Sequence, residues 1–63
     1  LTPRERECVR FSAEGLSAKE ISARIQRSVA TVTMHLNAAT RKLGARNRAQ
    51  LIARAAHYRL LQG

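Results

Sequence analysis

LSAKEISARIQRSVATVTMHL, residues 16–36, contains the two helix starts and the short turn that decide the fold. Ser17 and Glu20 have the spacing of a capping box, in which each side chain accepts a hydrogen bond from the backbone N–H of the other residue. Ser28 is a simpler N-terminal cap for the following helix. Only residues 26–28 separate the two predicted helices. A link this short joins either antiparallel neighbours in a bundle or the crossed pair of a helix-turn-helix.

Similar signals mark a helix on each side of this pair. TPRE at residues 2–5 predicts a capping box with proline at the first helical position, and NRAQ at residues 47–50 predicts another box. Gly15 and Gly44 stand where the C-terminus of a helix requires a left-handed residue. The sequence therefore predicts an all-α fold, a four-helix bundle that contains a helix-turn-helix. The predicted helices span residues 3–14, 18–25, 29–43 and 48–61.

Charge is distributed unevenly along the chain of 63 residues, whose formal net charge is +8. All four acidic residues lie within residues 1–20, whereas residues 21–63 contain eight arginines or lysines and no acid. Charge of a single sign over two thirds of a domain indicates a polyanionic partner, either a nucleic acid or a membrane surface. The caps and helix breakers predict compact, separate helices rather than a lipid-facing amphipathic surface, so we expect a nucleic acid and no membrane.

The composition also argues against an enzyme and a cofactor site. A chain of this length buries only roughly 60% of its unfolded surface, which leaves no room for a cleft with its supporting residues. One cysteine, Cys8, and two histidines cannot form a metal cluster or an internal disulfide. No apolar run approaches the ~20 residues of a membrane span, and we expect no signal peptide. We expect no cofactor, no metal and a cytoplasmic location.

The predicted helix 29–43 has two different faces. Its apolar stripe, at positions i, i+4, i+7 and i+11, consists of Val32, Leu36, Ala39 and Leu43. The side chains that point away from this stripe are Ala30, Met34, Asn37 and Arg41, with Thr33 on the flank. Base edges in the major groove are recognised by amides, hydroxyls and apolar groups that contact methyls, whereas phosphates are bound by Arg, Lys and helix N-termini. A neutral face surrounded by positive charge therefore favours a helix that enters the groove, although an ordinary solvated face is the alternative.

These features together resemble the LuxR-type (GerE-like) helix-turn-helix output domain of bacterial transcription regulators. The resemblance covers nearly the whole chain and rests on LTPRE, EGLSAKEI, TVTMHL and the run KLGARNRAQ. It implies a four-helix domain that binds double-stranded DNA at inverted-repeat promoter sites as a homodimer. Whether the homodimer forms only on DNA is left open. It also implies that this chain is the C-terminal fragment of a longer regulator, and RNA polymerase is a further candidate partner. The stretch 31–48 favours the quorum-sensing branch, in which an upstream domain binds an autoinducer rather than receiving a phosphate.

The resemblance also assigns roles to individual residues. The residues expected to contact bases are Thr33, Met34 and Asn37. The residues expected to bind phosphates, from the resemblance and the charge pattern together, are Ser17, Lys19, Arg27, Ser28, Thr31, Arg41, Arg46 and Arg48. Two alternatives remain. A sigma-factor promoter-binding domain shares the leading helix and the crossed pair but typically ends after the recognition helix, and a non-specific basic domain would coat DNA without reading it.

The turn departs from the usual pattern of the family. Its Leu-Gly-apolar-Ser reads Ile25-Gln26-Arg27-Ser28 here, so the glycine is lost. Gln26 must then adopt a left-handed backbone at some cost, or the turn has a different geometry. Arg27 stands where an apolar residue usually closes the core, and its stem can cover the core while its charge reaches a phosphate.

The last predicted helix carries two apolar stripes, although a small domain needs only one for its core. One stripe contains Leu51, Ala55 and Tyr58, and the other runs along Ala49, Ile52, Ala53, Ala56 and Leu60. Alanines allow two helices to cross closely, and the resemblance implies dimerisation through this helix. The predicted dimer residues are Ala49, Ile52, Ala53 and Ala56. The alternatives are that both stripes belong to the core or that the second packs on an upstream domain.

Overall fold

The structure is a computed structural model that describes the backbone of residues 1–62 and the side chains of residues 1–58. Its elements are the helices α1 (Pro3–Ala13), α2 (Ala18–Ile25), α3 (Val29–Leu43) and α4 (Arg48–Gln62). The predicted all-α fold is confirmed, and the predicted bounds of α2 and α3 agree with the structure. Helix α1 ends one residue earlier than predicted, because Glu14 serves as its C-terminal cap. Helix α4 continues one residue further, to Gln62.

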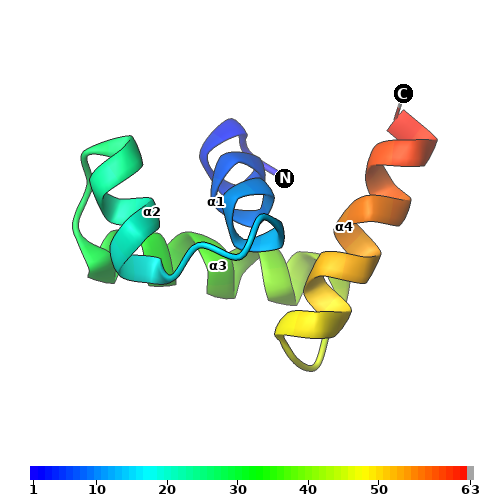
Figure 1. The fold of residues 1–63 in the computed structure, drawn as a ribbon. Helices are drawn as coiled ribbons and strands as arrows, with labels where there is room; N and C mark the ends of the chain where they lie inside the picture. Colours follow the sequence, from blue (N-terminus) through cyan, green and yellow to red (C-terminus); the bar gives the residue numbers. More distant parts are fainter. Residues whose placement is uncertain (63) are drawn as a thin grey trace.

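The helices are arranged around α1 and α3. Figure 1 shows α3 running across the lower part of the molecule, with α1 and α2 above it and α4 passing its C-terminal end; α1 lies between α2 and α4. Helix α2 crosses α3 instead of running antiparallel to it, so the short link between them belongs to a helix-turn-helix. One long side of α3 therefore remains uncovered by the rest of the described chain.

The predicted helix caps are present in the structure, with one exception. The Thr2–Glu5 and Ser17–Glu20 pairs form complete capping boxes. The Oγ of Ser28 accepts from the Thr31 backbone N–H at 3.1 Å, as a simple cap should. The exception is the predicted box at the start of α4. Asn47 accepts from the Gln50 backbone N–H at 2.8 Å, but the Gln50 side chain bonds the N–H of Arg46 instead of that of Asn47.

The core is aliphatic and draws on all four helices. The predicted apolar stripe of α3 faces inward, with Leu43 half-buried at its end. The buried hydrophobic residues are Cys8, Val9, Ile21, Ile25, Val32, Leu36, Ala39 and Leu51. Burial raises the pKa of the Cys8 thiol, and the neighbouring Glu7 carboxylate raises it further. Cys8 therefore behaves as a small apolar core residue rather than as a reactive thiolate.

The turn between α2 and α3 keeps a left-handed residue without the usual glycine. Gln26 has φ of 56° and ψ of 48°, and its N–H and that of Arg27 both donate to the Ser22 carbonyl. A left-handed conformation costs a residue with a side chain about 1–2 kcal/mol. The Arg27 guanidinium donates to the Gln26 carbonyl oxygen at 3.0 Å, which places its charge on the surface of the turn.

Candidate nucleic-acid interface

The uncovered side of α3 carries small and neutral side chains. Its exposed residues in the first three turns are Val29, Ala30, Thr33, Met34 and Asn37. Ala30, Met34 and Asn37 lie opposite the buried stripe, as the helical period predicts, Thr33 lies on the flank, and Val29 is exposed in the first turn at the edge of the stripe. They include an amide, a hydroxyl and several methyl groups, which are the groups that contact base edges in a major groove. The three residues predicted to contact bases are therefore exposed on one face of one helix.

The helix that presents this face is fixed at both ends. At its start, the hydroxyls of Ser28 and Thr31 lie 2.9 Å apart and are hydrogen-bonded. Near its end, the Thr40 hydroxyl donates to the Leu36 carbonyl at 2.7 Å, and Gly44 closes the helix in the left-handed conformation with φ of 66°. The caps at Ser28 and Gly44 define the two ends of α3, so the domain itself sets which backbone positions carry the exposed side chains.

An ion pair between distant parts of the chain also holds α3. The Lys42 ammonium lies 2.8 Å and 3.1 Å from the two carboxylate oxygens of Glu5, which is buried at the start of α1. The hydrogen bond from Lys42 and a backbone hydrogen bond from Thr2 lower the pKa of the Glu5 carboxyl, although its burial opposes this. Sequence reasoning missed this pair, because the capping box fully accounts for Glu5 and no local pattern connects positions 37 residues apart.

The residues predicted to bind phosphate surround α3 on several elements. They stand at the starts of α2 and α3, in the turn between them, near the end of α3 and in the loop before α4. Ser17, Lys19, Arg27, Ser28, Arg41, Arg46 and Arg48 are exposed, and Thr31 is half-buried. The geometry is compatible with a cationic rim around a neutral face, and the individual phosphate contacts remain predictions.

Arg48 has a structural contact that the sequence did not reveal. Its guanidinium donates to the Oγ of Ser12 at 2.7 Å, and Ser12 is buried on α1. This hydrogen bond ties the start of α4 to α1. Arg46, two residues earlier, has no side-chain partner for its guanidinium among residues 1–58. Of the two arginines, Arg46 is therefore the freer to meet a phosphate.

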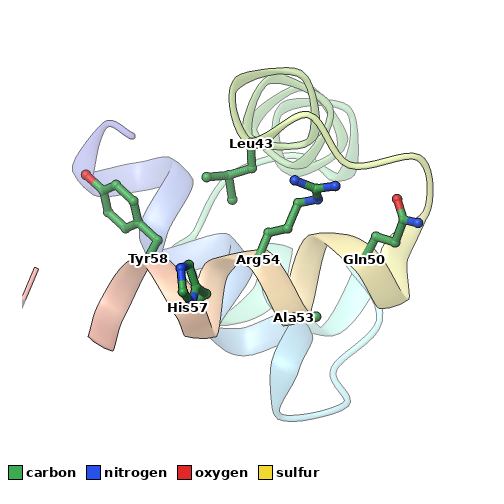
Figure 2. Close-up of a pocket in the computed structure, with 6 residues that line it drawn as sticks. All are labelled: Leu43, Gln50, Ala53, Arg54, His57 and Tyr58. Atoms are coloured by element: carbon green, nitrogen blue, oxygen red, sulfur yellow. The ribbon is translucent and has the colours of Figure 1, made fainter. Parts of the chain in front are cut away.

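The outer side of α4 carries the residues predicted to form a dimer. Ala49, Ala53 and Ala56 are exposed and make a ridge of small side chains, while Ile52 is half-buried. A hollow lies on each side of this ridge. One, between α4 and the end of α3, is shown in Figure 2, where the Arg54 side chain extends toward Leu43. The other lies between α4 and α1, and Ile52 and Ala56 are among its lining residues.

Neither a metal centre nor a membrane span is found in the described part of the chain. No group of three or more His, Cys, Asp or Glu side chains there could hold a metal ion. Within the same residues, every helix is too short or too polar to cross a lipid bilayer.

Comparison with known proteins identifies the family. The family described as bacterial regulatory proteins, luxR family, matches residues 1–55. The transcriptional activator protein VanR of Vibrio anguillarum is 49% identical over 55 residues, which are 87% of this chain and 23% of that protein. BjaR1 of Bradyrhizobium diazoefficiens, also a transcriptional activator protein, is 41% identical over 61 residues, which are 97% of this chain and 25% of that protein. The transcriptional activator protein LuxR of Aliivibrio fischeri is 46% identical over 55 residues, which are 87% of this chain and 22% of that protein.

The chain spans about a quarter of the length of these relatives. No solved structure matches it. The matched family and the relatives are transcription regulators and not enzymes, in agreement with the small size of the domain. The matched residues include the capped crossed pair α2–α3 and the first half of α4. From this match, and from the helix-turn-helix that the fold displays, the chain belongs to the luxR family of bacterial regulatory proteins.

Proposed function

We propose that this domain is the sequence-specific DNA-binding part of a bacterial transcription regulator and that α3 enters the major groove. The observation that carries the proposal is the exposed neutral face of α3 inside a domain of net charge +8. A helix that only attracted phosphates would gain from cations on that face. Hydrogen-bonding and methyl-contacting groups there serve to distinguish base pairs.

The exposed side chains divide into groups with different roles. The Asn37 amide can donate to and accept from the same adenine, at N7 and N6, and the Thr33 hydroxyl can bond to several bases. Met34 supplies an apolar contact. Around them, the hydroxyls and cations of the rim would bind phosphates and set the register of the helix in the groove. The N-termini of α2 and α3 add backbone N–H groups and a partial positive charge.

Two copies of the domain would bind together at an inverted repeat. The ridge of Ala49, Ala53 and Ala56 is exposed and small, and such side chains allow two helices to approach closely. Ile52 at the edge of the ridge would add apolar contact. An interface confined to one helix buries little area, so we expect the dimer to depend on DNA. Two-fold symmetry of the dimer would require an inverted repeat, and we expect the centres of its half-sites to be about 10 bp, one helical turn, apart.

The remaining part of the regulator would control this domain. The three relatives named above are about four times as long as this chain, and the resemblance to the quorum-sensing branch favours an upstream domain that binds an autoinducer. Such a protein would act in the cytoplasm at promoters, where RNA polymerase is a candidate partner.

Selection from randomised duplexes tests the proposal directly. The purified chain is incubated with a pool of randomised double-stranded DNA, and the bound fraction is amplified and sequenced. We expect enrichment of an inverted repeat. Salt titrations of the enriched duplex and of the random pool would then separate the contribution of base contacts from that of phosphate contacts, since the phosphate contacts contribute similarly to both.

Asn37→Ala sharpens the test. We expect it to weaken binding to the enriched duplex by about 1–3 kcal/mol and to relax the preference at one or two base pairs, with binding to random DNA nearly unchanged. Equal losses on both kinds of DNA would refute base reading by α3. Steep salt dependence without any enriched sequence would instead identify a non-specific basic domain, and a direct repeat or a single half-site would refute the symmetric dimer.

A further inference from the structure

We infer that a second copy of this chain packs against α1 as well as against α4. In this pair the two α4 helices run in the same direction, and the Arg54 side of each α4 lies against the hollow between α1 and α4 of the partner. This inference rests on the proposed function, and it adds to that function the orientation of the pair and a binding surface on α1.

The first observation is that the two hollows beside the alanine ridge differ in charge. The hollow between α4 and the end of α3, here called the Arg54 hollow, has no acidic residue among the six that line it in Figure 2. The hollow between α4 and α1, here called the α1 hollow, is lined by Glu7 and Glu14 together with Arg6 and Arg10. Because all acidic residues lie within residues 1–20, the carboxylates next to the ridge come from α1, and none come from α3 or α4.

Two-fold symmetry allows two ways to join a pair of ridges, because the same patch of each copy must meet its twin. If the α4 helices run antiparallel, the same side of each ridge meets, so the Arg54 hollow of one copy faces the Arg54 hollow of the other with no carboxylate on either side. If the helices run in the same direction, opposite sides meet, and each Arg54 hollow faces the α1 hollow of the partner, where carboxylates are present. Like charges that face each other across an interface are unfavourable. The charge distribution therefore favours the second arrangement.

The course of α4 favours the same arrangement independently. Figure 1 shows α4 beginning beside the C-terminal end of α3 and running toward the side on which α1 and α2 lie, away from the uncovered side of α3. Two neutral faces that enter one duplex must both point toward it. Each α4 then leads away from the DNA, so the two helices run in roughly the same direction. An antiparallel pair would turn the two neutral faces to opposite sides.

The α1 hollow also supplies contact area that the ridge lacks. A ridge of three alanines offers little surface, whereas a stable interface usually buries about 800 Å² on each partner. Among the residues that line the α1 hollow, Val9 is buried and Ile52 and Tyr58 are half-buried, while most of the charged side chains from α1 are exposed. An apolar centre with a polar rim is the usual anatomy of a protein–protein interface. A second copy seated there would cover the apolar residues and bring its Arg54 to the charged rim.

Cysteine cross-linking on DNA tests the orientation. Ala49 and Ala56 lie about 10 Å apart along the ridge, whereas a disulfide joins residues whose Cα atoms lie within about 7 Å of each other. On the duplex enriched by selection, we expect Ala49→Cys and Ala56→Cys each to form a disulfide with its own kind under mild oxidation by oxidised glutathione. A mixture of the two variants, one of which carries a size tag, should form few mixed disulfides. The unmodified chain, whose Cys8 is buried, and Ala23→Cys on α2 are the controls and should not cross-link.

Charge variants test the pairing with α1. Arg54→Gln should lower the cooperativity of binding to the inverted repeat by about two- to tenfold, since an exposed ion pair contributes up to about fivefold and two-fold symmetry makes two such pairs. Affinity for a duplex with one half-site, measured in parallel, accounts for the cation lost from the DNA-binding domain. At least one of Glu7→Gln and Glu14→Gln should also lower the cooperativity, and adding it to Arg54→Gln should cause little further loss. Arg24→Gln on α2 removes the same charge far from the ridge and should leave the cooperativity unchanged.

The outcomes separate this inference from the proposed function. Disulfides that form chiefly in the mixture of Ala49→Cys with Ala56→Cys would identify an antiparallel pair and refute the inference, while base reading by α3 would stand. Cooperative binding without any of these disulfides, or with fully additive losses from the charge variants, would place the contact elsewhere and overturn the inference as stated. Failure to enrich an inverted repeat, or binding to it without cooperativity, would overturn the symmetric dimer of the proposed function, and the inference with it.

Discussion

The two parts of α3, a first half that ends at Asn37 and a second half from Ala38 to Leu43, differ in how their polar side chains are bonded. In the second half, Lys42 is bonded to Glu5 on α1, and the Thr40 hydroxyl is bonded to the backbone one turn earlier. In the first half, Thr33 and Asn37 are exposed, with no side-chain partner among residues 1–58. The second half is therefore fixed by the domain itself, whereas in the first half the Thr31 hydroxyl is bonded to Ser28, and the side chains of Thr33 and Asn37 are left free to bond another molecule. A single helix can thus be both a structural element and a binding surface, with the division lying along its length.

Leu36→Ala should have the largest effect, because it removes the side chain beneath both halves. Leu36 is 2% exposed and sits in the middle of the core stripe. Truncation of such a leucine typically lowers the free energy of unfolding by about 2–5 kcal/mol. Urea denaturation followed by circular dichroism measures this. A loss below about 1 kcal/mol would mean that α3 is held chiefly by its ends.

Glu5→Gln should affect only the second half of α3, because it removes the ion pair that holds Lys42. Glutamine can still complete the capping box with Thr2, so the variant removes the ion pair and little else. We expect a loss of about 1–3 kcal/mol in the free energy of unfolding, with the base preferences of the first half unchanged. Lys42→Gln is the matched variant, and the double variant should be little worse than either one. Additive losses would show that the two charges are not coupled.

The same ion pair should make stability depend on pH. Since the pKa of Glu5 is lowered in the folded protein, its contribution is fully present above the ordinary glutamate pKa of 4.5 and is lost as the pH falls through the lower folded value. Glu20 also has a lowered pKa, chiefly through the backbone hydrogen bond within its capping box with Ser17. Comparison of the wild-type chain with Glu5→Gln between pH 6 and pH 2 isolates the Glu5 part. Parallel curves would contradict its assignment to this carboxylate.

Arg46→Ala tests the cationic rim without touching either half of α3. We expect weaker binding to all DNA sequences alike, with the salt dependence reduced by about one unit in the slope of log K against log salt. Base preferences and unfolding should not change. Arg48→Ala makes an instructive comparison, because it also removes the hydrogen bond to Ser12 and should lower stability as well. A sequence-dependent loss for Arg46→Ala would place this residue at a base edge.

Gln26→Gly should have the smallest effect, an increase in the free energy of unfolding. Glycine adopts the left-handed backbone of this position without strain, so we expect a gain of roughly 0.5–1 kcal/mol after the added flexibility of the unfolded chain is counted. Gly44→Ala is the counterpart at the other end of α3. No atom lies within 4 Å of the added methyl group there, so any loss comes from the backbone alone. A destabilising Gln26→Gly would mean that the glutamine side chain contributes to the turn.

Local features of the chain could be predicted from the sequence, and long-range polar contacts could not. The bounds of α2 and α3 and the inward stripe of α3 follow from patterns within a few residues, and the left-handed Gln26 is one of the two turn geometries that the sequence left open. No such pattern decides between core and surface for Phe11. It packs half-buried on the core, with the Arg10 and Arg24 guanidinium carbons 5.3 Å and 5.9 Å from its ring centroid.

The polar contacts that connect the helices have no such signal. The pairs Glu5–Lys42 and Ser12–Arg48 join residues 37 and 36 positions apart. Each depends on the angle at which helices meet, which the period of one helix does not specify. For the same reason the sequence placed Arg48 only among the phosphate-binding residues. The neutral face of α3 was predictable because exposure on a helix follows from its period once the core stripe is known.

The hydrogen bond between Arg48 and Ser12 has a consequence for how a pair of domains would measure DNA. It fastens the beginning of α4 to α1, which also touches α3, so the alanine ridge and the neutral face of α3 belong to one packed unit. In a pair joined through the ridge, the protein would fix the distance between the two copies of α3. The duplex would have to twist or bend to meet it, and spacers of the wrong length would be rejected even when both half-sites are correct.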